Sequence, residues 1–201
     1  MEKYLSFKIT GDFEKDIKEY FLMHHRLDTY EHTLDVVREL YNIEKQFGFI
    51  EEGSDIACYC HDLGRVVDRS EIIEFCIENN ISITDEERQM PSILHQKISR
   101  FIAENVFGIK NENILNAIRY HTTLRREPSN MEMEVLLADK LSWKEEGYEE
   151  LIKGIREAVE HSKEKAIFFY LTDLELNKES LPLYHRDSKE AYEYFRQKLN
   201  T

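Results

Sequence analysis

Residues 56–64 read IACYCHDLG, and this stretch places two polar side chains, His61 and Asp62, in an otherwise apolar run. Charged side chains are rarely fully buried in proteins unless they are paired or bind a metal ion. Four further residues with metal-binding side chains lie in other hydrophobic helical patterns, namely His32, His95, His121 and Asp139. Together the six side chains predict a metal centre inside a helical core rather than a solvated surface.

The composition and the spacing of apolar residues both favour helices. Only 7 of the 201 residues are glycine and 3 are proline, while 33% are charged, which is typical of long helices with short connections. Apolar side chains recur at helical spacing over about 13–23 and about 30–47, and Gly48 is a stop signal for the second helix. No segment alternates convincingly as a strand does. The predicted fold class is all-α.

Capping residues predict where the helices around the polar side chains begin. Ser54 is suited to cap the helix that carries the tandem His-Asp pair, and Ser92 is suited to begin the helix that carries His95. Asn111 is suited to cap the helix that reaches His121. On the last two of these helices the histidine shares a face with apolar residues, which directs it toward the core.

The other two polar residues also fall on apolar faces. His32 shares a face with Val36, and Asp139 shares a face with Val135. A lone histidine on such a face is more often a satisfied core residue than a metal ligand. For Asp139 the structural alternative is a buried ion pair with an arginine such as Arg119. The metal interpretation therefore depends on the whole set and its order along the chain.

The net charge of −13 limits the partners of this chain. It argues against nucleic acid bound through a general basic face, and it requires a locally cationic site for any phosphorylated substrate. No run of about 18 apolar residues is present, and the amino-terminal residues lack the apolar run of a signal peptide. The three cysteines indicate reduced thiols rather than a disulfide framework. We expect a cytoplasmic protein that does not associate with membranes, and the sequence leaves a homodimer open.

The order His32, His61-Asp62, Asp139 resembles the signature of the HD superfamily of metal-dependent phosphohydrolases. That family uses a histidine, a tandem His-Asp and a distant aspartate on a helical bundle. His95 and His121 are similar to the two additional histidines of its two-metal members. Longer stretches around these residues, at 30–33, 60–65, 114–122 and 137–140, resemble the YqeK-like proteins. Those proteins are di-iron enzymes that split diadenosine tetraphosphate symmetrically into two ADP molecules.

The resemblance implies an HD-type helical bundle and a ligand set for two metal ions. The domain spans 1–201, with a motif core over about 30–140 and a helical carboxy-terminal extension over 147–201. One metal is then held by His32, His61, Asp62 and Asp139, and the other by Asp62, His95 and His121. Asp62 is the natural bridge because a carboxylate offers two oxygens. Two ions about 3.5–4 Å apart can polarise a phosphoryl group and generate hydroxide at neutral pH.

The identity of the metal follows from the resemblance alone. Imidazole and carboxylate ligands suit iron, manganese, zinc or nickel. The resemblance favours iron, and manganese, nickel or magnesium stay open for the same ligands.

Four arginines are candidates for phosphate contacts. Arg65 lies three residues after Asp62, one helical turn from the predicted bridge, where the family usually has lysine. We expect Arg65 to bind the substrate phosphate beside the catalytic Asp62, and its structural alternative is a surface ion pair. Arg119, Arg125 and Arg126 are weaker candidates.

The chain also departs from the YqeK-like pattern near the expected substrate mouth. Residues 140–144 read KLSWK, whereas those proteins continue Tyr-Ile-Glu-Pro after the aspartate. Residues 123–126 read TLRR, whereas those proteins tend to have Ser-Gly-Arg. Thr29 stands where they usually have arginine. Trp143 and Tyr148 are expected in the core rather than in a base-stacking platform. The departures leave the metal chemistry intact and the substrate open.

The sequence therefore predicts a two-metal phosphohydrolase of nucleotides, with a dinucleoside polyphosphate cleaved to ADP as the leading substrate. The first alternative is an HD hydrolase of a different phosphoester. The second is a non-catalytic sensor that keeps the HD scaffold to bind a nucleotide. A helical scaffold without a site is the third, and it requires that no metal is bound.

Overall fold

The computed structural model describes residues 2–144 and 146–199, and all regular elements in these ranges are helices. The all-α prediction is confirmed. The α-helices are α1 (Phe13–Met23), α2 (Leu27–Phe47), α3 (Ser54–Cys60), α4 (Ile72–Glu78), α5 (Asp85–Gln89), α6 (His95–Asn105), α7 (Glu112–Tyr120), α8 (Asn130–Leu141), α9 (Glu149–Val159), α10 (Lys163–Leu176) and α11 (Arg186–Leu199). Three short 3-10 helices are η1 (Glu2–Tyr4), η2 (Leu63–Val66) and η3 (Pro91–Leu94).

Several helix ends follow directly from local sequence. Asp12 caps α1 by accepting from the backbone N–H of Lys15, and α1 coincides with the helix predicted over about 13–23. The long helix α2 ends at Gly48, whose φ of +82° is readily adopted only by glycine. Asn111 caps α7 through the backbone N–H of Asn113, as predicted.

Two predicted helix starts are wrong. The residue before α3 is Gly53, and the Ser54 hydroxyl donates instead to the buried carboxylate of Glu134. Ser92 does not begin an α-helix, because Pro91 opens the 3-10 turn η3 and α6 begins only at His95. This turn places His95 at the very start of α6.

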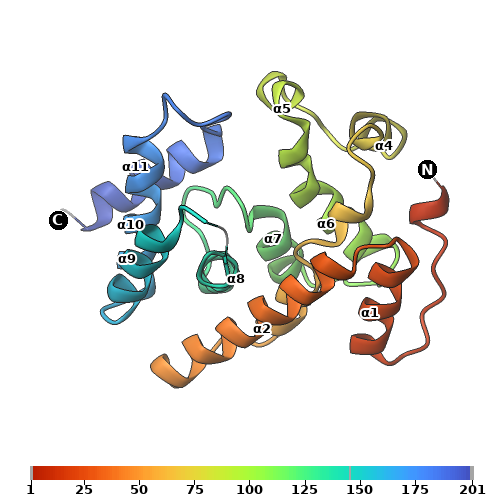
Figure 1. Ribbon diagram of the computed structural model, residues 1–201, viewed down its shortest axis with the longest axis horizontal. Helices are drawn as coiled ribbons and strands as arrows, with labels where there is room; N and C mark the ends of the chain where they lie inside the picture. Colours follow the sequence, from red (N-terminus) through yellow and green to blue (C-terminus); the bar gives the residue numbers. More distant parts are fainter. Residues whose placement is uncertain (1, 145, 200–201) are drawn as a thin grey trace.

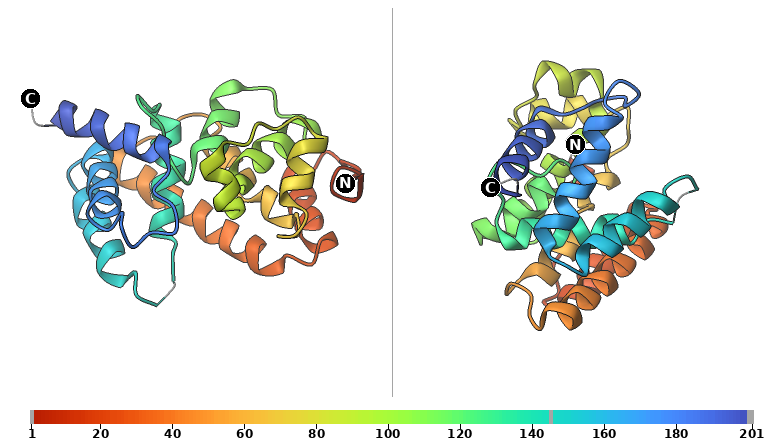
Figure 2. Two further views of the ribbon diagram at one scale, coloured as in Figure 1. Left: turned by 90° about the horizontal axis from the view of Figure 1, so that it is seen from above. Right: turned by 90° about the vertical axis from the view of Figure 1, so that its left-hand side faces the viewer.

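The core lies where α2, α3, α7 and α8 pack on one another. In Figures 1 and 2 the long helix α2 runs along one side of the molecule, and α9, α10 and α11 gather at the end opposite the amino terminus. Helix α8 is buried from Met131 to Leu141 and forms the centre between α2, α7 and α10. In the described residues no helix is both long and apolar enough to cross a membrane.

Candidate metal centre

The six polar residues predicted from the sequence converge in the middle of the helical core. His32 projects from α2 and Asp139 from α8. His61 and Asp62 lie between α3 and η2, His95 begins α6, and His121 follows the last residue of α7. Five segments that are distant in the sequence therefore supply one cluster. In the described residues the six side chains therefore come together, as predicted.

A glycine permits the close approach of two of these segments. Gly64, two residues after Asp62, lies against the first turn of α6, where a Cβ atom would come within 2.2 Å of the His95 carbonyl oxygen. Its backbone N–H donates to the Ser99 hydroxyl at 2.8 Å. Any larger residue at position 64 would push η2 away from α6. Gly64 thus sets the spacing between Asp62 and His95.

Two imidazoles and two carboxylates form one side of the cluster. His32 Nε2 lies 3.2 Å from Asp139 Oδ1 and 3.9 Å from Asp62 Oδ2. His61 Nε2 lies 3.6 Å from Asp62 Oδ2 and 4.0 Å from Asp139 Oδ1. Donor atoms of His32, His61 and Asp62 all lie within 4.8 Å of one another. This spacing suits ligands of a single metal ion.

The other oxygen of Asp62 faces the second pair of imidazoles. Asp62 Oδ1 lies 3.4 Å from His95 Nε2 and 3.5 Å from His121 Nε2, and these two nitrogens are 3.0 Å apart. Asp62 therefore presents one carboxylate oxygen to each histidine pair. A carboxylate in this position can bridge two metal ions.

Backbone hydrogen bonds set the tautomer of three of the histidines. Nδ1 of His61, His95 and His121 donates in each case to the carbonyl oxygen three residues earlier in the chain, at 2.7–2.8 Å. Because the proton is on Nδ1, each Nε2 is left with a lone pair that points into the cluster. A histidine that binds a metal is typically oriented in this way by a hydrogen bond from its other nitrogen.

The electrostatics of the cluster fit a cationic ligand. Burial lowers the pKa of His61 to about 4 and lowers that of His95 well below its usual value, so both imidazoles are neutral at pH 7. Burial raises the pKa of Asp62, but its neighbours, chiefly the Arg65 guanidinium, outweigh this effect and hold that carboxyl ionised. The same balance, with Lys140 as the main neighbour, keeps Asp139 ionised.

Two buried atoms of the cluster lack a hydrogen-bond partner among the described residues, His61 Nε2 and Asp62 Oδ1. An unpaired buried polar atom costs about 1–3 kcal/mol, and more when it is charged. Neutral imidazoles and ionised carboxylates aimed at a common point are the donor set of iron, manganese, zinc and nickel sites. The residues present therefore fit a metal centre.

A cavity of about 830 Å³ opens above the cluster. His32, Asp62, His95 and Asp139 reach it from the cluster. Its walls include Arg65, Arg69, Lys140, Trp143, Lys144 and Tyr148, together with three acids of α2, Asp28, Glu31 and Asp35. Cavities of about 300–1,000 Å³ are typical of small-molecule sites, so this one has room for a nucleotide.

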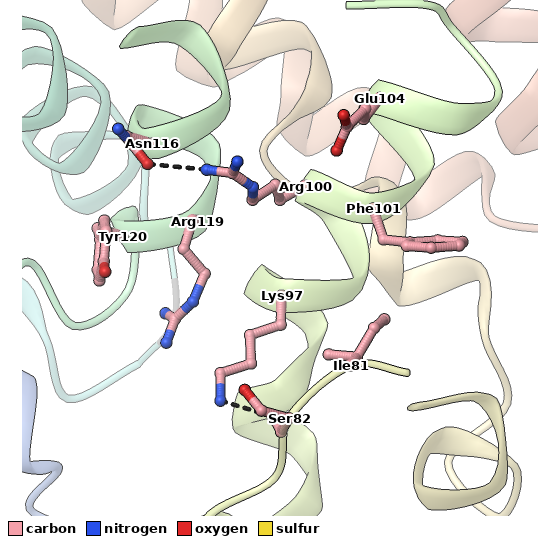
Figure 3. A pocket seen from close by; sticks show the side chains of 9 residues that line it. All are labelled: Ile81, Ser82, Lys97, Arg100, Phe101, Glu104, Asn116, Arg119 and Tyr120. Carbon is pink, nitrogen blue, oxygen red and sulfur yellow. Dashed lines mark hydrogen bonds between the residues drawn. The ribbon is translucent and has the colours of Figure 1, made fainter. Parts of the chain in front are cut away.

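The structure separates the predicted arginines. Arg65 lines the cavity, is half exposed, and donates from Nε to Asp62 Oδ2 at 2.6 Å. Arg119 lies instead in a second cavity, beside Tyr120 (Figure 3). Arg125 makes a two-pronged hydrogen bond to the buried Glu132, and Arg126 is an exposed residue that pairs with its neighbour. Of the four, Arg65 alone lines the cavity above the cluster in the described part of the chain.

Two residues beside Asp139 escape the sequence prediction. Lys140 is buried, and its Nζ donates to Asp139 Oδ2 at 2.6 Å. Trp143 is half buried and lines the cavity, with Nε1 donating to Asp139 Oδ1 at 3.3 Å, which corrects its expected place in the core. Tyr148 is exposed and meets the Trp143 ring edge to face, with centroids 4.9 Å apart. The sequence signal that could have identified Lys140 and Trp143 is their closeness to the predicted metal ligand Asp139.

Comparison with known proteins agrees with this geometry. Residues 29–144 match the HD domain family, a range that includes all six residues of the cluster. The chain is 34% identical over 116 residues to an uncharacterised protein in the pepC 5' region of Lactococcus lactis subsp. cremoris, covering 58% of this chain and 60% of that protein. It is 30% identical over 110 residues to the symmetrical bis(5'-nucleosyl)-tetraphosphatase of Halalkalibacterium halodurans, covering 55% of this chain and 58% of the relative. The matched region thus spans less than two thirds of each of these curated relatives.

A solved structure matches over almost the whole chain. It is a predicted HD superfamily hydrolase involved in NAD metabolism from Clostridium acetobutylicum, and it superposes with a TM-score of 0.81 at 25% sequence identity. The match covers 92% of this chain and 97% of that protein. The family match over more than half of the chain, together with this shared fold, shows that the chain belongs to the HD domain family.

Proposed function

We propose that this protein is a two-metal phosphohydrolase that cleaves a phosphoanhydride bond of a nucleotide, with a dinucleoside tetraphosphate split to ADP as the leading substrate. The observation that carries the proposal is Asp62, a buried carboxylate with one oxygen facing each of two histidine pairs. Such an arrangement has no purpose in packing, because it leaves Asp62 Oδ1 without a hydrogen-bond partner among the described residues.

The metal ligands follow from the two histidine pairs. One ion would be held by His32, His61, Asp62 and Asp139, and the second by Asp62, His95 and His121. Metal ions at these positions, with iron favoured by the resemblance, would polarise a phosphoryl group and lower the pKa of water. The chain's own contribution is to fix the imidazole tautomers through backbone carbonyls and to keep both carboxylates ionised.

The cavity walls support a polyphosphate ligand. Arg65 and Arg69 follow the His-Asp pair in the sequence and line the cavity. A planar guanidinium group can bind two oxygens of one phosphate at once. We assign to Arg65 the contact with the phosphate next to the cleaved bond, because its guanidinium is already held over the cluster by Asp62. Arg119 and Arg125 have no such place in this cavity.

The aromatic part of the cavity lining supports a nucleoside. Trp143 and Tyr148 line the cavity as an aromatic edge-to-face pair, and Lys140 Nζ lies 4.5 Å from the centre of the Trp143 ring. Base stacking on an aromatic side chain is worth about 1–3 kcal/mol. The same residues are also where the chain departs from the YqeK-like pattern, which keeps a different nucleotide or phosphoester as the second candidate.

Product analysis tests the reaction. Metal-replete protein is incubated with diadenosine tetraphosphate and the nucleotides are separated by chromatography. ADP as the sole product is expected. Equal amounts of ATP and AMP would contradict symmetrical cleavage, and intact substrate with metal still bound would contradict this substrate class and direct the search to mononucleotides and other phosphoesters.

Fluorescence tests the nucleoside contact independently of turnover. Trp143 is the sole tryptophan of the chain, so its emission reports on this cavity alone. Titration with ADP is expected to change the emission, while inorganic phosphate at the same occupancy leaves it nearly unchanged. Equal responses to both ligands would show that the base does not contact Trp143. No response to either ligand would contradict the proposal that this cavity binds a nucleotide.

A further inference from the structure

We propose that a second cavity, between α6 and α7, binds a small molecule that carries a phosphate group. This cavity has a volume of about 420 Å³, and Figure 3 shows Lys97, Arg100 and Arg119 around it. It shares no lining residue with the cavity above the metal cluster. Its size lies in the range of small-molecule sites and leaves room for an organic group beside the phosphate.

The lining of the cavity offers N–H donors to an anion. Three cationic side chains line the cavity together with one acid, Glu104. Each cation has a carboxylate partner outside the lining: Lys97 pairs with Glu87, Arg100 with Glu112 and Arg119 with Asp187. A phosphate would therefore bind through the N–H groups that these pairs leave available.

The guanidinium of Arg119 is one of two nearly buried cations at this cavity, with Lys97. Its side chain is 14% exposed, and burial lowers its pKa. Asp187 Oδ2 lies 3.5 Å from Arg119 Nη2, which is too long for a good hydrogen bond, and the Gln96 amide, oriented to satisfy both of its ends, accepts from Nη1 at 3.1 Å. A guanidinium has five N–H donors, so Arg119 retains donors for a phosphate.

The ammonium of Lys97 faces the same space. In Figure 3 the side chains of Lys97 and Arg119 extend from two different helices toward the same end of the cavity. Lys97 Nζ donates to the Ser82 carbonyl at 2.8 Å and to Glu87 Oε2 at 2.7 Å, which uses two of its three N–H groups. Arg100, one turn further along α6, is held by the Asn116 side chain at 2.8 Å. The cations are therefore positioned before a ligand arrives.

The position of this cavity gives it a link to the metal centre. Lys97 lies two residues after His95 on α6, and Arg119 lies two residues before His121 at the end of α7. A phosphate held by both cations would tie together the two helix ends that carry the second histidine pair. The ligand also competes with Asp187, which belongs to α11 in the carboxy-terminal part of the chain.

The test measures the binding of radiolabelled inorganic phosphate to the full chain by equilibrium dialysis. It is run on the metal-loaded protein and on Asp62→Ala, which removes the phosphate site that the proposed function places at the metal centre. We expect one class of binding sites to persist in Asp62→Ala, so the result does not depend on turnover or on the proposed function. Saturation of this class only at molar phosphate would identify an adventitious ion and overturn the proposal.

Two variants of the ion pair separate binding from structure. Arg119→Gln is expected to weaken the persistent class by about tenfold or more, because it removes charge-assisted hydrogen bonds. Asp187→Asn breaks the same ion pair but removes the competing carboxylate, so phosphate is expected to bind more tightly. An equal loss of binding in both variants would show a structural role for the pair and contradict the site.

Arg100→Gln replaces Arg119→Gln in the binding test if the unfolding transition of Arg119→Gln shows that this variant does not fold. Arg100 lies at the more exposed side of the cavity, and we expect Arg100→Gln to weaken phosphate binding several-fold, with Arg65→Gln as the matched control at the other cavity. Unchanged binding in Arg100→Gln and Arg119→Gln, or an equal loss in Arg65→Gln, would overturn the assignment.

Discussion

Two buried carboxylates of the core, Asp62 and Glu134, differ in how the protein satisfies them. Glu134 on α8 is fully buried and accepts hydrogen bonds from the Ser54 hydroxyl at 2.6 Å and from Lys163 Nζ at 2.7 Å. Its Oε2 also accepts from the backbone N–H of Glu51 at 3.1 Å. Every oxygen of this carboxylate therefore has a protein partner, and Lys163 supplies the opposite charge.

Asp62 is buried to the same degree but is left incomplete. Its Oδ2 accepts from Arg65, while its Oδ1 faces two imidazole nitrogens without a hydrogen bond among the described residues. The comparison teaches that burial of an acid is not by itself a sign of a functional site. The distinguishing sign is a buried carboxylate that the chain does not satisfy, because a ligand must then do so.

The largest expected effect is the loss of turnover when the Asp62 side chain is truncated. Asp62→Ala removes the carboxylate that both histidine pairs share, so we expect no detectable hydrolysis while the far-ultraviolet circular dichroism keeps most of its helical signal. Activity is measured on the same substrate as for the wild type. Near wild-type activity in Asp62→Ala would show that Asp62 does not bridge the site.

The satisfied acid is expected to behave in the opposite way. Glu134→Gln leaves the nearly buried Lys163 without its counter-charge, and breaking a buried ion pair typically costs about 3–5 kcal/mol. We expect this loss in the free energy of unfolding measured in urea, with turnover per folded molecule retained. A variant as stable as the wild type but inactive would reverse the roles that we assign to the two acids.

The neighbour of the incomplete acid gives an intermediate effect. Arg65→Gln removes a cation that we place on the substrate phosphate, and a hydrogen bond to a charged group is worth about 1.5–3 kcal/mol, or roughly tenfold or more in affinity. We expect a rise in KM with the metal content unchanged, and partial recovery in Arg65→Lys. An unchanged KM would reduce Arg65 to a surface partner of Asp62.

The smallest effect concerns a third buried acid, Glu87. Burial raises its pKa, but the nearby His185 imidazole, together with hydrogen bonds from Lys97 and the Thr84 backbone, lowers it far below the usual value. The folded state thus favours the ionised form, so this stabilisation is present above about pH 4 and is lost as the pH falls further. We expect the wild type to lose stability more steeply than Glu87→Gln below that pH in urea titrations. Parallel curves would exclude the contribution.

The sequence was sufficient for helix ends that depend on neighbouring residues. Gly48 and Asn111 act within one turn of the helix end that they define, so their effect is visible in a short stretch. Ser54 is different, because its hydroxyl is taken by Glu134 from a helix 80 residues away. Local capping rules cannot foresee such a contact.

The same distinction applies to the candidate site. The six residues of the cluster have the right types and order in the sequence, whereas the placement of arginines depends on which way each helix faces. Arg119 precedes His121 by two residues, which is a rotation of about 200° on an α-helix and puts the two side chains on opposite faces. A phosphate role at the metal centre, as predicted for Arg119, conflicts with that geometry.

Trp143 shows a third limit. It follows Asp139 by four residues, so both fall on one face, and sequence alone does not tell a core face from a cavity wall. Helix α8 ends at Leu141, and this leaves Trp143 at the edge of the cavity rather than within the helical core. The end of the helix, together with what lies beyond it, decides its role.

The number of metal ions bound per chain tests whether Asp62 joins the two histidine pairs. Wild type, Glu134→Gln and Asp62→Ala are loaded with iron or manganese, freed of excess metal, and analysed by inductively coupled plasma mass spectrometry. We expect two ions per chain in the wild type and in Glu134→Gln, and none in Asp62→Ala. A wild-type protein without bound metal, or Asp62→Ala with the same metal content as the wild type, would contradict this expectation.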